Sequence, residues 1–135
     1  MNIIIDTNVW ISFAVGKNLT PMRRLLTNPE LKVYVCKELL EESALVASRP
    51  RIRRHLREDD IRDTRELMKW FCHHVAIGGK AVSAVRDKKD AYLLSLAETV
   101  SADFVVTGDQ ELLALHTHHR TRIVTYKEFA AILGM

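Results

Sequence analysis

The sequence lacks the features that mark secreted, membrane-spanning or thiolate-metal proteins. It contains only two cysteines, Cys36 and Cys72, which are far apart and belong to no C-x-x-C pair. A zinc site built on thiolates is therefore not expected, and the apolar neighbours of both residues predict reduced thiols in the core. No apolar run approaches the roughly 20 residues of a membrane helix. Residues 1–6 lack the pattern of a signal peptide, so we expect a cytoplasmic protein without membrane association.

An excess of charge of one sign is also missing. The formal net charge is +3 over 135 residues, which permits an anionic partner but does not demand one. Five arginines are nevertheless concentrated in one short segment: Arg49, Arg51, Arg53, Arg54 and Arg57. This segment is either a solvated helix face or a surface that contacts the phosphates of a nucleic acid. Its composition does not decide between the two.

The length and the 47% hydrophobic content suit one globular domain that spans residues 1–135. Short β-branched runs predict strands at residues 3–5, 32–36, 104–107 and 122–125. Residues 75–77 are either a fifth strand or a loop. Helical patterns fill the intervals, and this alternation predicts an α/β fold, a three-layer α/β/α sandwich around a central, mainly parallel twisted sheet.

Several residues predict where helices begin. Thr20 is a cap in front of a proline, and Asp60 and Asp87 are each placed to cap a helix. Thr125 with Glu128 forms the pattern of a capping box. A further helix is predicted over residues 37–47.

Two aspartates follow predicted strands directly. Asp6 follows residues 3–5, and Asp109 follows residues 104–107 and a glycine. In open α/β sheets, ligand sites form beyond the carboxyl ends of the strands. If the sheet is doubly wound, these two strands are neighbours and both carboxylates face one crevice.

Two predicted helices add further carboxylates. Glu42 lies among the apolar residues of the helix over 37–47, whereas Glu38 and Glu41 fall on its solvent side. Asp87 and Asp90 are three residues apart and so share a helix face. Because Asp87 is the better cap, Asp90 is left to point toward the crevice.

Each acid also has a purely structural interpretation: a strand end for Asp6, the protein surface for Glu42, a helix N-terminus for Asp90 and a turn for Asp109. Their joint placement is what indicates chemistry. Four carboxylates in one crevice repel one another and favour the hard cations Mg²⁺ or Mn²⁺. Two such ions would orient a water molecule and stabilise the leaving oxygen of a phosphodiester.

Five blocks of the sequence resemble, in order, the PIN-domain family, in its branch of toxin components of toxin–antitoxin systems (VapC-like ribonucleases). The blocks are residues 4–9 (IIDTNV), 38–42 (ELLEE) followed by Arg49-Pro50, 86–90 (RDKKD), 102–109 (ADFVVTGD) and 123–129 (IVTYKEF). The resemblance spans nearly the whole chain. It implies a Mg²⁺- or Mn²⁺-dependent nuclease acting on single-stranded RNA, an antitoxin partner and a tendency to form homodimers.

The resemblance places metal-binding and catalytic roles on Asp6, Glu42, Asp90 and Asp109, with Asn8 and Thr107 as supporting polar groups. Two positions stay open. Lys88 stands where family members often have proline, which leaves Asp87 as an alternative to Asp90, and Glu41 is an alternative to Glu42. Asp103 precedes its strand and is expected at the opposite end of the sheet.

Other functions fit less well. A phosphatase of the haloacid dehalogenase type needs an acid two residues after the first aspartate, where this chain has Asn8. A non-catalytic PIN-like module that binds RNA or protein typically lacks one or more acids, and all four are present here. A structure-specific DNA nuclease of the same broad group usually carries additional segments.

Histidines add no predicted site. His116, His118 and His119 fall in a predicted polar loop, and His73 and His74 at a predicted helix end. A transition metal would need a third ligand. None stands at a convincing spacing, so we expect a solvent-exposed loop.

Overall fold

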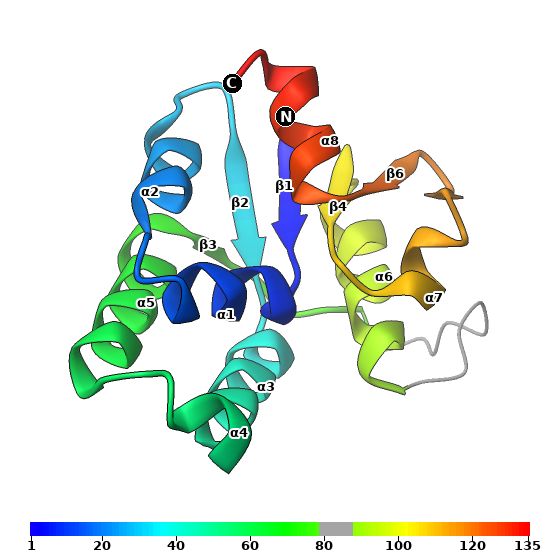
Figure 1. Ribbon diagram of the computed structural model, residues 1–135. Helices are drawn as coiled ribbons and strands as arrows, with labels where there is room; N and C mark the ends of the chain where they lie inside the picture. Colours follow the sequence, from blue (N-terminus) through cyan, green and yellow to red (C-terminus); the bar gives the residue numbers. More distant parts are fainter. Residues whose placement is uncertain (79–87) are drawn as a thin grey trace.

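A six-stranded sheet forms the middle layer of the computed structural model, which describes residues 1–78 and 88–135 (Figure 1). The strands are β1 Asn2–Ile5, β2 Lys32–Val35, β3 His73–His74, β4 Phe104–Val106, β5 Thr117–His118 and β6 Thr121–Val124. Their order is β3-β2-β1-β4-β6-β5, and every pair is parallel except β5 with β6. The predicted mainly parallel sheet is confirmed.

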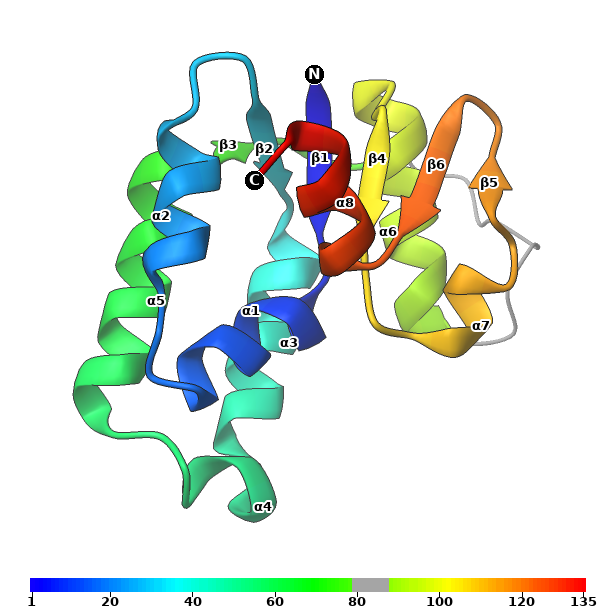
Figure 2. The same cartoon turned by 45° about the horizontal axis from the view of Figure 1, so that its top comes forward.

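Helices cover both faces of this sheet, as predicted for an α/β/α sandwich. They are α1 Thr7–Val15, α2 Thr20–Thr27, α3 Lys37–Ser48, α4 Pro50–Arg53, α5 Glu58–Phe71, α6 Lys88–Val100, α7 Gln110–Leu113 and α8 Tyr126–Leu133. Helix α6 contacts β1 and β4 on one face, while Phe129 of α8 packs on Phe104 of β4, with ring centroids 5.3 Å apart. Figures 1 and 2 show α6 and α8 on opposite sides of β4.

The central position of β1 explains its sequence. Ile3, Ile4 and Ile5 are each at most 1% exposed because both faces of the strand are covered. The chain leaves β1 toward β2 on one side and returns to β4 on the other. The carboxyl ends of β1 and β4 therefore lie at the switch point of the sheet, where α/β proteins place their ligand sites.

Several local predictions are confirmed. The helix predicted over residues 37–47 is α3, and Thr125 with Glu128 forms the capping box of α8. Cys36 and Cys72 are buried free thiols. Within the described part of the chain, no helix has the length and apolar character needed to cross a membrane.

Other predictions place the start of a helix at the wrong residue. Arg57 is the N-cap of α5, and Asp60 lies at its third position, where its carboxylate accepts the Arg57 backbone N–H. Leu19 is the N-cap of α2, so Thr20 is already helical. The predicted cap Asp87 lies outside the described residues.

The histidine segments also differ from prediction. His73 and His74 form β3 and not a helix end, since the ladder with β2 adds hydrogen bonds that a helix end would lack. Residues 75–77, left open between a strand and a loop, follow β3 as a loop. His118 belongs to β5, which pairs with β6 in place of the predicted loop.

Helix α1 was not located from the sequence. Its apolar residues occupy positions 9–11 and 13–15 and so lie around most of its circumference. A helix that is apolar on several sides shows no single apolar stripe, and the stripe is the signal that identifies a helix in a sequence.

Candidate active site

Asp6 lies where β1 ends and α1 begins, and its orientation is fixed by hydrogen bonds. Its Oδ1 accepts the backbone N–H of Thr7 at 2.7 Å, which caps α1. Its Oδ2 accepts the hydroxyl of Thr107, from the end of β4, also at 2.7 Å. The side chain is only 5% exposed, so this carboxylate is held rigidly between the two central strands.

The surroundings of Asp6 disfavour its charge. The pKa of Asp6 is raised from 3.8 to about 6, mainly by burial and to a smaller extent by the nearby carboxylates of Glu42 and Asp109, while hydrogen bonds from Thr107 and Thr7 oppose the rise. Asp6, Glu42 and Asp109 are thus close enough to interact electrostatically, although they come from three separate segments. A bound cation would relieve this repulsion.

Asp109 lies in the turn between β4 and α7. Its Oδ1 accepts the N–H groups of Glu111 at 2.8 Å and Leu112 at 3.2 Å, which caps α7. Its own N–H donates to the Thr107 hydroxyl oxygen at 3.0 Å. Because this same hydroxyl donates to Asp6, Thr107 connects the two aspartates, as expected of a supporting residue.

Asn8 supports the same turn from α1. Its Oδ1 accepts the N–H of Gly108 at 3.3 Å. Next to it, the Thr7 hydroxyl lies 3.3 Å from the hydroxyl of Ser43 on α3. The first turn of α1 is therefore connected to both the β4 turn and α3.

Glu42 reaches the site from α3. Its Oε2 accepts the hydroxyl of Tyr92, from α6, at 2.6 Å. Burial together with Glu42 and Asp6 raises the pKa of Tyr92, so the phenol stays protonated and acts as a donor. Glu41 instead points to solvent and pairs with Lys37 at 3.7 Å. The contacts therefore favour Glu42 over Glu41.

Asp90 is 8% exposed in the first turn of α6. This is the helix whose Tyr92 reaches Glu42, and Figure 1 shows it starting at the end of the sheet where β1 and β4 finish. Sequence reasoning missed Tyr92, because an aromatic residue on a predicted helix is normally assigned to the core. Asp103 lies at the opposite end of the sheet, where it accepts the N–H of Asn2 at 2.8 Å.

These carboxylates provide an oxygen-only set of possible ligands. Such a set fits Mg²⁺ or Mn²⁺ better than softer metals. The raised pKa of Asp6, caused mainly by burial, is a second sign of fit, since a divalent ion would stabilise the charged form of a buried carboxylate that lies near two others. Asp6, Glu42, Asp90 and Asp109 could hold such an ion.

The arginine-rich segment forms α4 and the turns on either side of it. Four of its arginines are exposed: Arg49, Arg51, Arg54 and Arg57. Arg53 is engaged, since it pairs with Glu58 at 2.5 Å and donates to the carbonyl oxygen of Leu56. Arg49 ends α3, about 10 Å along that helix from Glu42.

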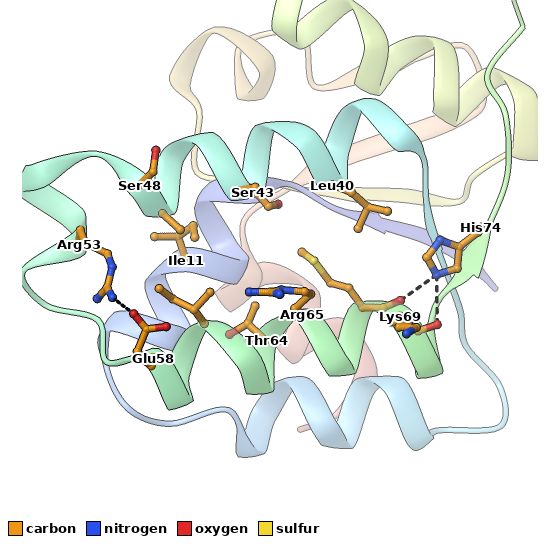
Figure 3. Close-up of a pocket in the computed structure, with 14 residues that line it drawn as sticks. Ile11, Leu40, Ser43, Ser48, Arg53, Glu58, Thr64, Arg65, Lys69 and His74 are labelled. Atoms are coloured by element: carbon orange, nitrogen blue, oxygen red, sulfur yellow. Dashed lines mark hydrogen bonds and ion pairs between the residues drawn. The ribbon is translucent and has the colours of Figure 1, made fainter.

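A cavity lies beside α3. It is a groove of about 540 Å³ between α3 and α5, with Ile11 of α1 on its floor (Figure 3). Most of its lining is apolar, including Leu40 and Ala44 on α3 and Met68 on α5. The Arg53–Glu58 ion pair closes one end in Figure 3, and His74 lies at the other. A groove of this kind suits an apolar partner better than a polyanion.

Comparison with known proteins gives two positive results. A family model described as PIN domain matches residues 2–111, a span that contains all four acids. The fold is similar to the crystal structure of VapBC2 from Rickettsia felis bound to a DNA fragment from its promoter. That likeness has a TM-score of 0.57 at 12% sequence identity, covering 91% of this chain and 97% of the other. No curated protein matches the sequence.

Proposed function

Because the chain belongs to the PIN-domain family, we propose that it is a metal-dependent endoribonuclease that hydrolyses phosphodiester bonds of single-stranded RNA. The observation that carries this proposal is the electrostatic cluster of Asp6, Glu42 and Asp109. A buried carboxylate that lies near two other carboxylates is costly to ionise without a metal. PIN domains are generally nucleases, and nucleases use such clusters to bind divalent ions.

In this proposal Asp6, Glu42, Asp90 and Asp109 hold Mg²⁺ or Mn²⁺. An ion held by these residues would supply an activated water and stabilise the leaving oxygen. The remaining residues keep the carboxylates in place: Thr107 fixes Asp6 and the turn of Asp109, and Tyr92 fixes Glu42. Asn8 holds the same turn through Gly108.

The arginine-rich segment would contact phosphates outside the reacting centre. Arg49, Arg51, Arg54 and Arg57 are exposed, and exposed arginines pair readily with phosphate groups. Arg53 has a smaller part in this role, because Glu58 already occupies its guanidinium group.

We further propose that the protein is the toxin of a toxin–antitoxin pair. The VapBC2 likeness and the sequence resemblance support this role, and the groove between α3 and α5 offers an apolar surface for an antitoxin. The nuclease would be one domain over residues 1–135, cytoplasmic and homodimeric. Buried free cysteines agree with a reducing compartment, and light scattering of the purified protein tests the dimer.

The adjacent residues Glu41 and Glu42 provide a matched test. Labelled single-stranded RNA is incubated with purified protein and Mg²⁺ or Mn²⁺, with chelator in a parallel reaction. We expect metal-dependent cleavage that Glu42→Gln lowers at least about a hundred-fold and Glu41→Gln leaves unchanged. Asp90→Asn, in the same assay, tests the fourth acid, and an unchanged rate would move that role to Asp87.

Two results would contradict the proposal. An equal loss of cleavage in Glu42→Gln and Glu41→Gln would show that Glu42 has no specific role in the site. A folded protein that neither cleaves several RNAs nor binds Mn²⁺ would instead be a PIN-like module that binds RNA or protein. Binding of Mn²⁺ without cleavage calls for the same assay after denaturation and refolding, which removes a co-purified inhibitor.

A further inference from the structure

A second group of metal-binding side chains lies at the far edge of the sheet. Glu98, near the end of α6, meets His118 and His119 at the β5–β6 hairpin. One ligand atom from each residue can be chosen so that all three lie within 4.8 Å of one another. The sequence concealed this group, because Glu98 precedes the histidines by about 20 residues and only the fold brings it to them.

Each histidine lies at a distance from Glu98 that is typical of neighbouring metal ligands, through a different oxygen of the carboxylate. His118 Nε2 lies 3.5 Å from Glu98 Oε2, and His119 Nε2 lies 3.3 Å from Glu98 Oε1. Metal–ligand bonds of roughly 2.0–2.2 Å at tetrahedral angles place neighbouring ligand atoms about 3.3–3.5 Å apart. Because the ring of His119 is exposed, it can rotate to adjust the distance between its ligand nitrogen and that of His118.

His118 supplies a second, independent observation. Its side chain is only 11% exposed, and its Nε2 is buried without a hydrogen-bond partner among the described residues. A buried polar atom normally has a partner, and one without needs an explanation. A cation between His118 and Glu98 would provide that partner.

The hairpin is held in position by contacts other than these three side chains. Arg120, in its turn, pairs with Asp103 at 2.6 Å. The Thr121 hydroxyl donates to the carbonyl oxygen of Ala102 at 2.7 Å. The strand pair β5–β6 joins His118 to Thr121. These contacts fix the backbone of the hairpin without any metal.

We propose that Glu98, His118 and His119 bind a divalent transition-metal ion of the Zn²⁺ class. Two imidazoles and one carboxylate suit Zn²⁺, whereas the oxygen-only acids of the nuclease site suit Mg²⁺ or Mn²⁺. The two sites are separate, since Glu98 lies about 12 Å along α6 from Asp90. The ion would bridge the hairpin and α6, and its binding does not depend on the nuclease proposal.

Two histidines in equivalent backbone positions allow a matched test. His119 and His116 both have a positive φ, 53° and 61°, and asparagine tolerates that conformation. Zn²⁺ binding is measured by calorimetry and Co²⁺ binding by absorption, in excess Mg²⁺ that occupies the carboxylates. We expect one Zn²⁺ per chain and a rise in melting temperature. Loss of an outer-shell partner costs up to about a hundred-fold in metal affinity. Because His119 is proposed as a direct ligand, His119→Asn should weaken Zn²⁺ binding by at least that factor, whereas His116→Asn should leave it unchanged.

Variants at the two sites separate the outcomes. Glu98→Gln should weaken Zn²⁺ binding, and Asp109→Asn, in the nuclease site, should leave it intact. The proposal is overturned if Asp109→Asn abolishes binding while His119→Asn does not, because the Zn²⁺ would then lie among the carboxylates. It is equally overturned if the folded wild type binds no Zn²⁺ at micromolar concentration, which would leave the three side chains as a simple ion-pair group.

Discussion

Helix α3 separates two regions of opposite character. On one side Glu42 joins Asp6 and Asp109 in a polar site, where each aspartate caps a helix and shares the Thr107 hydroxyl. On the other side the same helix lines an open, mainly apolar groove. The first region suits chemistry, because its carboxylates are held in place by directed hydrogen bonds. The second suits recognition, because apolar surface is adaptable and favours burial by a partner.

The two regions meet at one contact. Ser43 lines the groove, and its hydroxyl lies 3.3 Å from the hydroxyl of Thr7, whose backbone N–H donates to Asp6. A partner in the groove would therefore lie directly behind the carboxylate site. If the two regions have separate roles, a change in one should leave the activity of the other intact.

The largest effect is expected for Asp6→Asn, which should separate activity from stability. Cleavage should fall at least about a thousand-fold, since a metal ligand is lost. The free energy of unfolding without metal should rise at pH 8, because the variant buries no charge. A pKa raised from 3.8 to about 6 corresponds to roughly 3 kcal/mol, at about 1.4 kcal/mol per tenfold change in proton affinity.

The pH dependence gives the control. A group with a raised folded-state pKa contributes stability below its unfolded pKa and loses that contribution as the pH rises through the folded value. The advantage of Asp6→Asn should therefore be small near pH 4, grow up to about pH 6 and stay level above it. Urea unfolding in chelator at pH 4, 5 and 8 measures this. An equal effect at all three values would show that Asp6 is not a buried, ionisable carboxyl.

A smaller effect, confined to recognition, is expected for Ala44→Glu in the groove. Ala44 is exposed on α3, and glutamate is a good helix former, so the fold should be kept. A charge on the apolar wall should weaken capture of the proposed antitoxin about a hundred-fold, or roughly 3 kcal/mol. RNA cleavage by the free protein should stay within about twofold. Co-purification and cleavage assays on the same preparations check both.

Ala131→Glu, at an exposed position of α8, is the control for added charge. It should affect neither capture nor cleavage. If Ala44→Glu lowers cleavage as strongly as capture, the two regions are not separate, and the groove takes part in RNA binding. If it lowers neither, the antitoxin binds elsewhere.

The sheet and three of the proposed site acids follow from local sequence signals. Unbroken β-branched runs identify β1 and β4, and an aspartate after each run marks the carboxyl edge of the sheet. Parallel pairing then brings Asp6 and Asp109 together whatever the loops do. Glu42 required one further signal, the apolar residues around it on α3.

Contacts that depend on packing between distant segments were not predictable in this way. Tyr92 meets Glu42 only because α6 and α3 converge at one end of the sheet, and Glu98 meets His118 only because β5 returns beside α6. Neither relation leaves a periodicity or a fixed spacing in the sequence. Helix α1 was missed for a different reason, since its apolar residues lie on several sides and form no single stripe.

The smallest effect is expected for Tyr92→Phe, which tests how far the acid site depends on such a packing contact. The ring stays in place, but Glu42 loses the hydroxyl that donates to it at 2.6 Å. Outer-shell partners of metal ligands are worth about 10- to 100-fold, and we expect the lower end, about tenfold, because Glu42 itself remains. The loss should appear as a weaker apparent affinity for Mn²⁺, with much of the rate recovered at high Mn²⁺. Tyr34→Phe, whose ring packs on His73 of β3, should change neither quantity. A rate loss that Mn²⁺ does not recover would mean that the Tyr92 hydroxyl contacts the RNA and acts on the chemistry itself, so its hydrogen bond to Glu42 would not be its main role.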